Sequence, residues 1–104
     1  MIDRETALRA MAVHRDRVDE VDRVIVEMLN ERTRAVEEIG RIKREAAMPI
    51  YEPRREDEVF RNVTEHNCGP LTAEAVKRIF ERIIDEMRKV QRMRMEAQSD
   101  GETK

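Results

Sequence analysis

Four polar side chains interrupt faces that are otherwise apolar at helical spacing, and their types define the chemistry available to this chain. Arg32 and Lys43 fall in a first predicted helix, Glu56 in a second and Gln91 in a third. A guanidinium cannot be neutralised by deprotonation, so on a buried face it needs an anion beside it. Either the protein supplies that anion or a bound ligand does.

The charge balance of these positions allows two interpretations. In the first, a buried network pairs Glu56 with Arg32 or Lys43, and Gln91 fills a gap in the packing. In the second, the residues line an anion-binding pocket. The two cations outnumber the one obvious carboxylate, with further arginines at positions 15 and 55. This count favours the pocket, and the residues alone leave the network open.

The spacing limits which cations can reach one ligand. Arg32 and Lys43 are eleven residues apart, about three turns, so they share a helix face at roughly 16 Å along the axis. Two long side chains can converge from there on one small ligand. Arg15 lies about 25 Å before Arg32 and cannot join from the same helix. In an antiparallel or crossed dimer the partner's Arg15 could, which predicts two equivalent pockets.

Three helices in a single all-α domain, residues 1–104, are expected to position these groups. The first runs from about 4 to 47, after an N-cap at Asp3 and up to Met48 and Pro49. The second covers about 53–67 and opens on a proline, and the third covers about 73–97 after the cap Thr72. Residues 98–104 are predicted to be a frayed tail. Gly40 is the one weak point of the first helix and indicates close packing.

The apolar stripe of the first helix predicts a homodimer. Its members alternate at spacings of three and four residues: Met11, His14, Val18, Val21, Ile25, Met28, Arg32, Ala35, Ile39, Ile42 and Ala46. Some 43 residues of helix span roughly 65 Å, whereas a compact domain of this size has a radius of gyration near 13 Å. One chain cannot cover such a stripe, so we expect a second protomer to cover it.

The third helix is expected to supply the core of each chain. Its apolar positions are Val76, Ile79, Phe80, Ile83, Ile84, Met87 and Val90. Charged residues make up 42% of the sequence and aromatic residues 3%, which suits long helices with narrow apolar stripes.

Composition also excludes some classes of partner. The net charge of −2 provides no basic field for nucleic acid, and no apolar run approaches the length that spans a membrane. The single cysteine, Cys68, cannot form an internal disulfide and fits a reducing compartment. We therefore predict a cytoplasmic protein that binds neither nucleic acid nor membrane.

From residue 14 to residue 91 the chain resembles the all-helical class of chorismate mutases. The resemblance rests on polar positions at matching spacing across three helices. They lie in the segments RDRVDEVD (15–22), LNER (29–32), IGRIK (39–43), PIYEPRRE (49–56), GPL (69–71) and from Ile79 to Gln91. No single short segment is decisive, and the combination carries the likeness.

The resemblance implies an intertwined helical homodimer with two active sites and the rearrangement of chorismate to prephenate, on the way to phenylalanine and tyrosine. It also implies a role for each matching residue. Arg32 and the partner's Arg15 would hold the carboxylates of the substrate. Lys43 would contact a carboxylate and the ether oxygen, and Gln91 would donate to that oxygen. Glu52 and Glu56 would hold the ring hydroxyl, and Arg55 would line the pocket.

These residue types suit a pericyclic reaction. Such a rearrangement needs no nucleophile, metal or general base, and we expect no cofactor. It needs a flexible dianion held in a reactive conformer. Negative charge grows on the ether oxygen as the bond breaks, so fixed donors such as Lys43 and Gln91 would stabilise the transition state above the ground state. Gln91 is neutral, so its donation should not depend on pH.

Three features depart from the family pattern. Met87 stands where some members carry a small hydroxyl residue, Glu52 where a shorter acid can occur, and residues 1–13 extend beyond the likeness. Two other functions remain in competition. One is an isochorismate-pyruvate lyase. The other is a non-catalytic module that binds ligand, or that docks on and regulates another shikimate-pathway enzyme in a complex.

Overall fold

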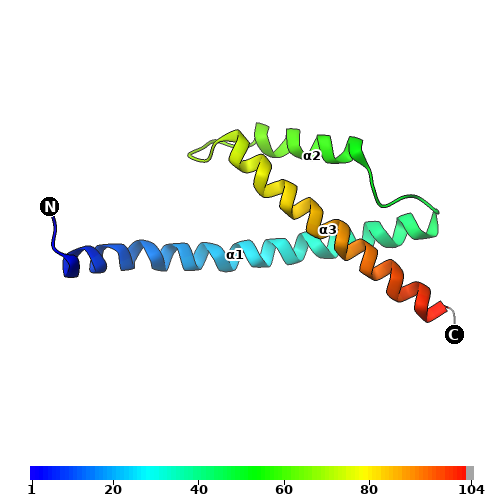
Figure 1. Ribbon diagram of the computed structural model, residues 1–104, viewed down its shortest axis with the longest axis horizontal. Helices are drawn as coiled ribbons and strands as arrows, with labels where there is room; N and C mark the ends of the chain where they lie inside the picture. Colours follow the sequence, from blue (N-terminus) through cyan, green and yellow to red (C-terminus); the bar gives the residue numbers. More distant parts are fainter. Residues whose placement is uncertain (103–104) are drawn as a thin grey trace. The chain divides into compact units, whose positions relative to one another are not determined.

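The structure is a computed structural model that describes the backbone of residues 1–102 and the side chains of residues 1–97. It contains α1 (Arg4–Glu45), α2 (Pro53–Glu65) and α3 (Ala73–Glu102), shown in Figure 1. No strand occurs in the described part, so the predicted all-α class with one very long helix is confirmed. The chain divides into two compact units, residues 1–34 and 35–104, which we describe separately.

Both predicted helix caps are present. The backbone N–H of Thr6 donates to Oδ1 of Asp3 at 2.8 Å, and that of Ala75 donates to Oγ1 of Thr72 at 3.1 Å. The bond from the Thr6 backbone holds the pKa of Asp3 below its ordinary value. Each cap satisfies a backbone donor that has no partner inside its helix, which sets the start of α1 and of α3.

The end of α1 lies two residues before the predicted one. Ala47 has a φ of 55°, and its N–H donates to the carbonyl of Arg44, while the N–H of Met48 donates to that of Lys43. This pair of bonds is the Schellman termination, with alanine in the left-handed position that glycine usually takes. The helix therefore ends at Glu45 because the backbone reverses there, before Pro49 can interrupt it.

The other two boundaries also differ from the predicted ones. α2 ends at Glu65 because Asn67 organises a turn: its side chain donates to the carbonyl of Leu71 and accepts from the N–H of Gly69. Gly69 has a φ of +77°, which glycine adopts readily. α3 continues to Glu102, beyond the predicted end at 97, since no proline interrupts it. Of the predicted frayed tail 98–104, residues 103 and 104 and all the side chains lie outside the described part.

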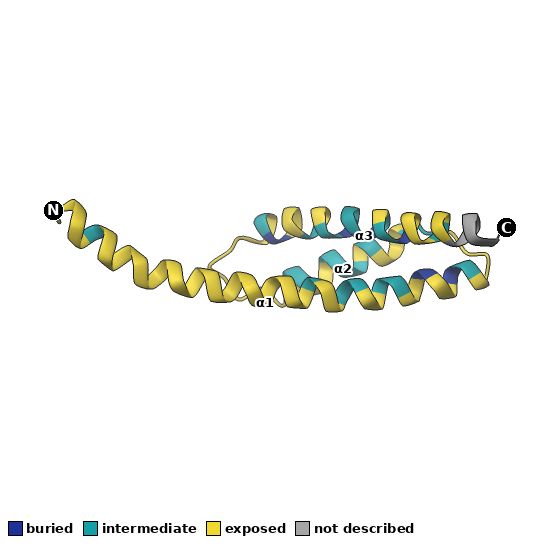
Figure 2. Ribbon diagram, turned by 90° about the horizontal axis from the view of Figure 1, so that it is seen from below, coloured by how far each residue is buried: buried dark blue, intermediate teal, exposed yellow. Residues whose placement is uncertain are grey.

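In the unit of residues 1–34, the predicted apolar stripe of α1 is exposed in the single chain. Val18, Ile25 and Met28 are each about half exposed, and almost all of this stretch is yellow in Figure 2. Large apolar side chains in such numbers are seldom left in water along a regular face. None of the described helices is long and apolar enough to cross a membrane.

In the unit of residues 35–104, α2 packs against α3, and α3 crosses the last turns of α1. The buried apolar side chains are Val76, Ile84 and Met87, all on α3. Ile79 is exposed, contrary to the prediction, because it lies at the edge of the stripe that these three residues centre. The remaining predicted core positions of α3 are partly buried.

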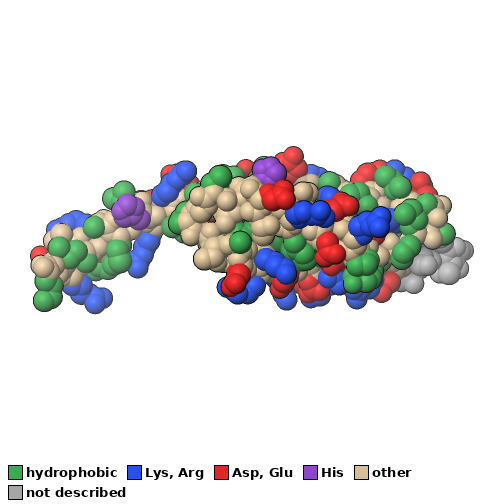
Figure 3. Space-filling view, turned by 90° about the horizontal axis from the view of Figure 1, so that it is seen from above, with side chains coloured by type: hydrophobic (Ala, Val, Ile, Leu, Met, Phe, Trp, Pro, Cys, Tyr) green, Lys and Arg blue, Asp and Glu red, His purple; other side chains and the backbone are tan. Residues whose placement is uncertain are grey.

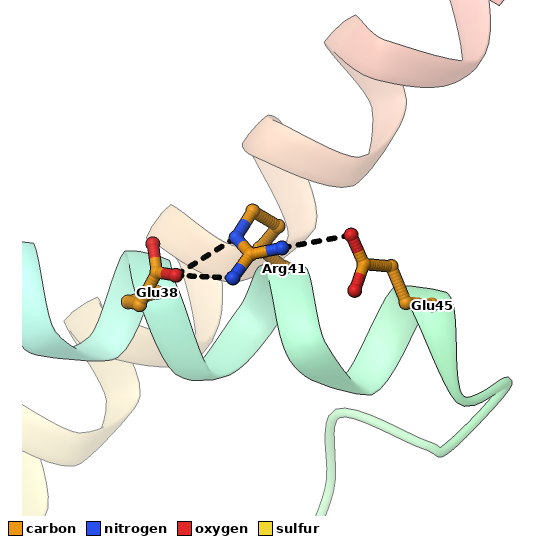
Figure 4. A network of polar contacts seen from close by, with 3 residues as sticks. All are labelled: Glu38, Arg41 and Glu45. Atoms are coloured by element: carbon orange, nitrogen blue, oxygen red, sulfur yellow. Dashed lines mark hydrogen bonds and ion pairs between the residues drawn. The ribbon is translucent and has the colours of Figure 1, made fainter.

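Charges of both signs are mixed over the surface. On the face shown in Figure 3, Lys and Arg side chains alternate with Asp and Glu side chains and form no large patch of one sign. Near the end of α1, Arg41 bonds Glu38 through Nε at 2.8 Å and Glu45 through Nη1 at 2.7 Å, as Figure 4 shows. These exposed pairs link successive turns of the helix.

Candidate active site

Lys43 is the most deeply buried charged residue in the described part of the chain. It is 6% exposed, on the last turns of α1. Its Nζ donates to the carbonyl of Ile50 at 2.9 Å and lies 2.7 Å from Oε1 of Glu52. A buried ammonium is stable only with such partners. An ammonium has three N–H donors, so these two contacts leave one for a ligand.

Glu52 occupies the residue before α2, yet it does not cap that helix. Its side chain makes no capping hydrogen bond, and the helix begins with Pro53. Short side chains such as Asp or Ser fold back onto the helix N-terminus most easily. The longer glutamate instead pairs with Lys43 and links the start of α2 to the end of α1. A position that departs from local preference in this way is often functional.

Gln91 is buried against α1, at 7% exposure. Its Nε2 donates to the backbone carbonyl of Val36 at 3.2 Å. Gly40 makes this approach possible, because a Cβ at that position would lie 3.2 Å from Cγ of Gln91. The close packing predicted at Gly40 is therefore confirmed. Gly40 and Lys43 are three residues apart, which brings Gln91 onto the helix face that carries Lys43.

Glu56 pairs with a residue that sequence reasoning missed. Its Oε1 lies 3.2 Å from Nη2 of Arg88 on α3. Lys43, which the network interpretation offered as a partner for Glu56, pairs with Glu52 instead. Arg88 follows Ile84 by four residues and precedes Gln91 by three. That spacing could have placed it beside the core face of α3.

The remaining predicted residues lie in other settings. Arg55 is exposed on α2 and pairs with Glu58 at 3.2 Å. Arg15 is exposed and Arg32 is half-buried, both on α1 within the unit of residues 1–34. Met87 is buried in the core with Val76 and Ile84. Among the described residues, the structure thus brings together Lys43 with Glu52 and, separately, Glu56 with Arg88, and it packs Gln91 beside Gly40.

The assembled groups can bind and stabilise negative charge. Lys43 and Gln91 are donors fixed in a dry environment, where electrostatic interactions are stronger than in water. Glu52 and Glu56 are acceptors with one carboxylate oxygen each in a described ion pair. No group of three or more His, Cys, Asp or Glu side chains able to hold a metal ion occurs in the described part.

A three-helix chain whose buried polar groups are an ammonium, an amide and carboxylates defines a class of all-α proteins that hold a small anion. The comparisons identify the family within that class. Residues 14–92 match the model of the chorismate mutase type II family, and the chain belongs to that family. These residues form its chorismate mutase domain.

Solved structures give the same fold. The chain is 37% identical to chorismate mutase (form II) of Thermus thermophilus, with a TM-score of 0.76 over 81% of this chain and 94% of that one. Form I of the same enzyme gives 39% identity and a TM-score of 0.71, over 76% and 98% of the two chains.

Relatives of known name are longer. The bifunctional chorismate mutase/prephenate dehydratase of Neisseria gonorrhoeae is 38% identical over 79 residues, which are 76% of this chain and 21% of that protein. The protein of the same name from Aquifex aeolicus is 36% identical over 74 residues, 67% of this chain and 20% of its own length. The chain therefore spans about a fifth of the length of these relatives.

Proposed function

We propose that this protein converts chorismate to prephenate by an intramolecular pericyclic rearrangement. One observation carries the proposal. Lys43 and Gln91 are the buried polar residues of the described part, each is held by a backbone carbonyl, and each has a further N–H to donate. Two such donors suit a reaction in which charge develops on a single oxygen.

Lys43 and Gln91 act on the ether oxygen of the substrate. The carbon–oxygen bond breaks ahead of carbon–carbon bond formation, so this oxygen gains negative charge in the transition state. Donors already fixed by Ile50, Glu52 and Val36 need no reorganisation to meet that charge. They lower the barrier because they bind the transition state more strongly than the ground state.

The carboxylates of Glu52 and Glu56 orient the ring of the substrate. In this proposal, both accept a hydrogen bond from the ring hydroxyl, and Arg55 lines the entrance. The ion pairs with Lys43 and Arg88 leave a second oxygen on each carboxylate for this contact. Binding at the ring restricts the flexible substrate to the compact conformer that reacts.

Two arginines of the unit at residues 1–34 complete the proposed site. Arg32 binds one carboxylate of the substrate, and the partner subunit's Arg15 binds the other. The sequence spacing and the family membership support this assignment. The exposed apolar stripe of α1 supports the dimer that it requires, because a second copy would remove that stripe from water.

The direct test is the loss of chorismate absorbance with purified protein, with identification of the product. Prephenate as the product supports the proposal. Pyruvate released from isochorismate would instead support the lyase, and binding of chorismate without turnover would support a regulatory module. No turnover of chorismate by the assembled protein contradicts the proposal.

A mixing experiment tests the shared site. Arg15→Ala and Arg32→Ala variants are each expected to lose most activity. If each site takes one arginine from each protomer, unfolding and refolding the two variants together restores about a quarter of the sites, since half the dimers are mixed and each has one intact site. Mixtures that stay as inactive as the separate variants would contradict the shared site.

We further propose that prephenate passes to a prephenate-consuming enzyme in the cytoplasm. The fused relatives are named for both activities, which supports this step in the reaction sequence. An increase in mutase turnover on adding a prephenate dehydratase, beyond the effect of removing product, would identify a complex. Unchanged turnover and separate elution from a sizing column would contradict the complex.

A further inference from the structure

Arg88 is a half-buried cation that the proposed reaction does not yet use. Its side chain is 33% exposed and pairs with Glu56, whose side chain is 19% exposed, at 3.2 Å. The pair joins α3 to α2 across 32 residues of sequence. By contrast, Arg82 on the same helix pairs with Glu86 one turn away at the surface, at 72% exposure. Only the first kind of pair can fix one helix's side chain relative to another helix.

Tyr51 holds the other side of the same guanidinium. The central carbon of Arg88 lies 5.6 Å from the centre of the Tyr51 ring, within the range of a cation–π interaction. Tyr51 directly precedes Glu52, so this contact reaches the segment between α1 and α2 that also supplies the partners of Lys43. Arg88 therefore contacts the Glu56 carboxylate and also the residue next to Glu52.

The hydrogen bonding of Arg88 is incomplete in a way that argues against a purely structural role. Its Nε is buried and has no hydrogen-bond partner. A buried donor left without an acceptor is destabilising. An apolar residue in this place would avoid that cost, so stability alone does not account for an arginine here. The guanidinium orientation that leaves Nε unpaired is the one that brings Nη2 to Glu56.

We propose that Arg88 is a positioning residue for Glu56. It engages Oε1 and leaves Oε2 directed to the ring hydroxyl of chorismate, so that the acid is held as a fixed acceptor. This inference rests on the proposed mutase function. Arg88 itself does not touch the reacting atoms, and its effect on the rate passes through Glu56.

The test compares kcat/KM for Arg88→Met, Arg88→Lys, Glu56→Gln and the double variant Arg88→Met with Glu56→Gln. Loss of a charge-assisted hydrogen bond corresponds to a decrease of about tenfold to a hundredfold for Arg88→Met. Arg88→Lys keeps the charge and should recover part of that loss. The control is Arg82→Met, which removes an exposed arginine from the same helix and should leave kcat/KM unchanged.

Two readouts separate positioning from a structural role. In the Glu56→Gln background, Arg88→Met should cause almost no further loss, because its target is already gone. A substrate analogue without the ring hydroxyl should react equally well with wild type and Arg88→Met. Thermal unfolding of every variant checks that the compared proteins are folded, and Arg88→Lys keeps the test available if Arg88→Met does not fold.

The results distinguish the two levels of inference. A wild type that does not convert chorismate overturns the mutase function and this inference together. An active wild type with undiminished Arg88→Met, or with losses that multiply fully in the double variant, overturns the role of Arg88 alone. A decrease of the same size with the analogue that lacks the hydroxyl also overturns it.

Discussion

A Cβ atom on Gly40 would lie 3.2 Å from Cγ of Gln91, so the two helices that meet here touch through a glycine and an amide side chain. Such a contact is tighter than most that side chains make, and Gln91 would have to move by a few tenths of an ångström to allow it. The position of the amide, and with it the aim of its donor, thus depends on a missing methyl group.

We expect Gly40→Ala to reduce catalysis more than stability. Alanine is the better helix former by about 1 kcal/mol, which offsets part of the strain in packing. Displacement of Gln91 should lower kcat by about tenfold or more, since misplacement of a donor weakens transition-state binding. Steady-state kinetics and chemical denaturation of both proteins measure the two effects. A full-rate Gly40→Ala enzyme would show that the position of Gln91 is not critical.

Lys43 provides a second prediction about the donors. Lys43→Ala should lower kcat by about a hundredfold to a thousandfold, the cost of removing one donor from a charge-stabilising site. The matched control is Lys89→Ala on α3, where the lysine is half exposed and its described ion pairs are with acids within one turn. Equal effects of the two substitutions, measured under saturating substrate, would argue against a special role for the buried lysine.

The apolar stripe of α1 offers a matched pair of positions to test the dimer. Ile25 belongs to the stripe and Val26 does not, and both are about half exposed in the single chain. Ile25→Asp should therefore weaken association and make activity fall on dilution, while Val26→Asp should not. Sedimentation at several concentrations checks this directly. Identical behaviour of the two variants would mean that this face is not the interface.

The pH dependence of stability should contain a contribution from Glu38. The side-chain hydrogen bond and charge of Arg41 hold the pKa of the Glu38 carboxyl below its ordinary value of 4.5. A group with a lowered folded-state pKa stabilises the protein above its unfolded value, and this is lost as the pH falls through the folded one.

Glu38→Gln should accordingly lower the thermal midpoint at neutral pH, and the difference from wild type should shrink as the pH falls below 4.5. Both carboxyl and amide are then neutral. Melting curves from neutral pH down to about pH 3, below the ordinary carboxyl range, measure the difference. A gap that stays constant over this range would assign the effect to packing or helix propensity instead of charge.

The sequence by itself determined the three helices, their caps at Asp3 and Thr72, and the polar positions that interrupt their faces. Caps and helical periodicity are local properties, encoded within a few residues, so they can be read without knowing the neighbours. The close approach at Gly40 was also predictable, because glycine inside a long helix has few other reasons to occur.

Only the tertiary structure decided which polar groups meet. Pairing depends on how separate helices pack, and a glutamate such as Glu56 has several cations within plausible reach in the sequence. The structure pairs it with Arg88 and pairs Lys43 with Glu52. It also ended α1 at Glu45, where alanine takes a left-handed conformation that residue preferences do not favour. Local chemistry thus set the elements, and packing between them selected the partners.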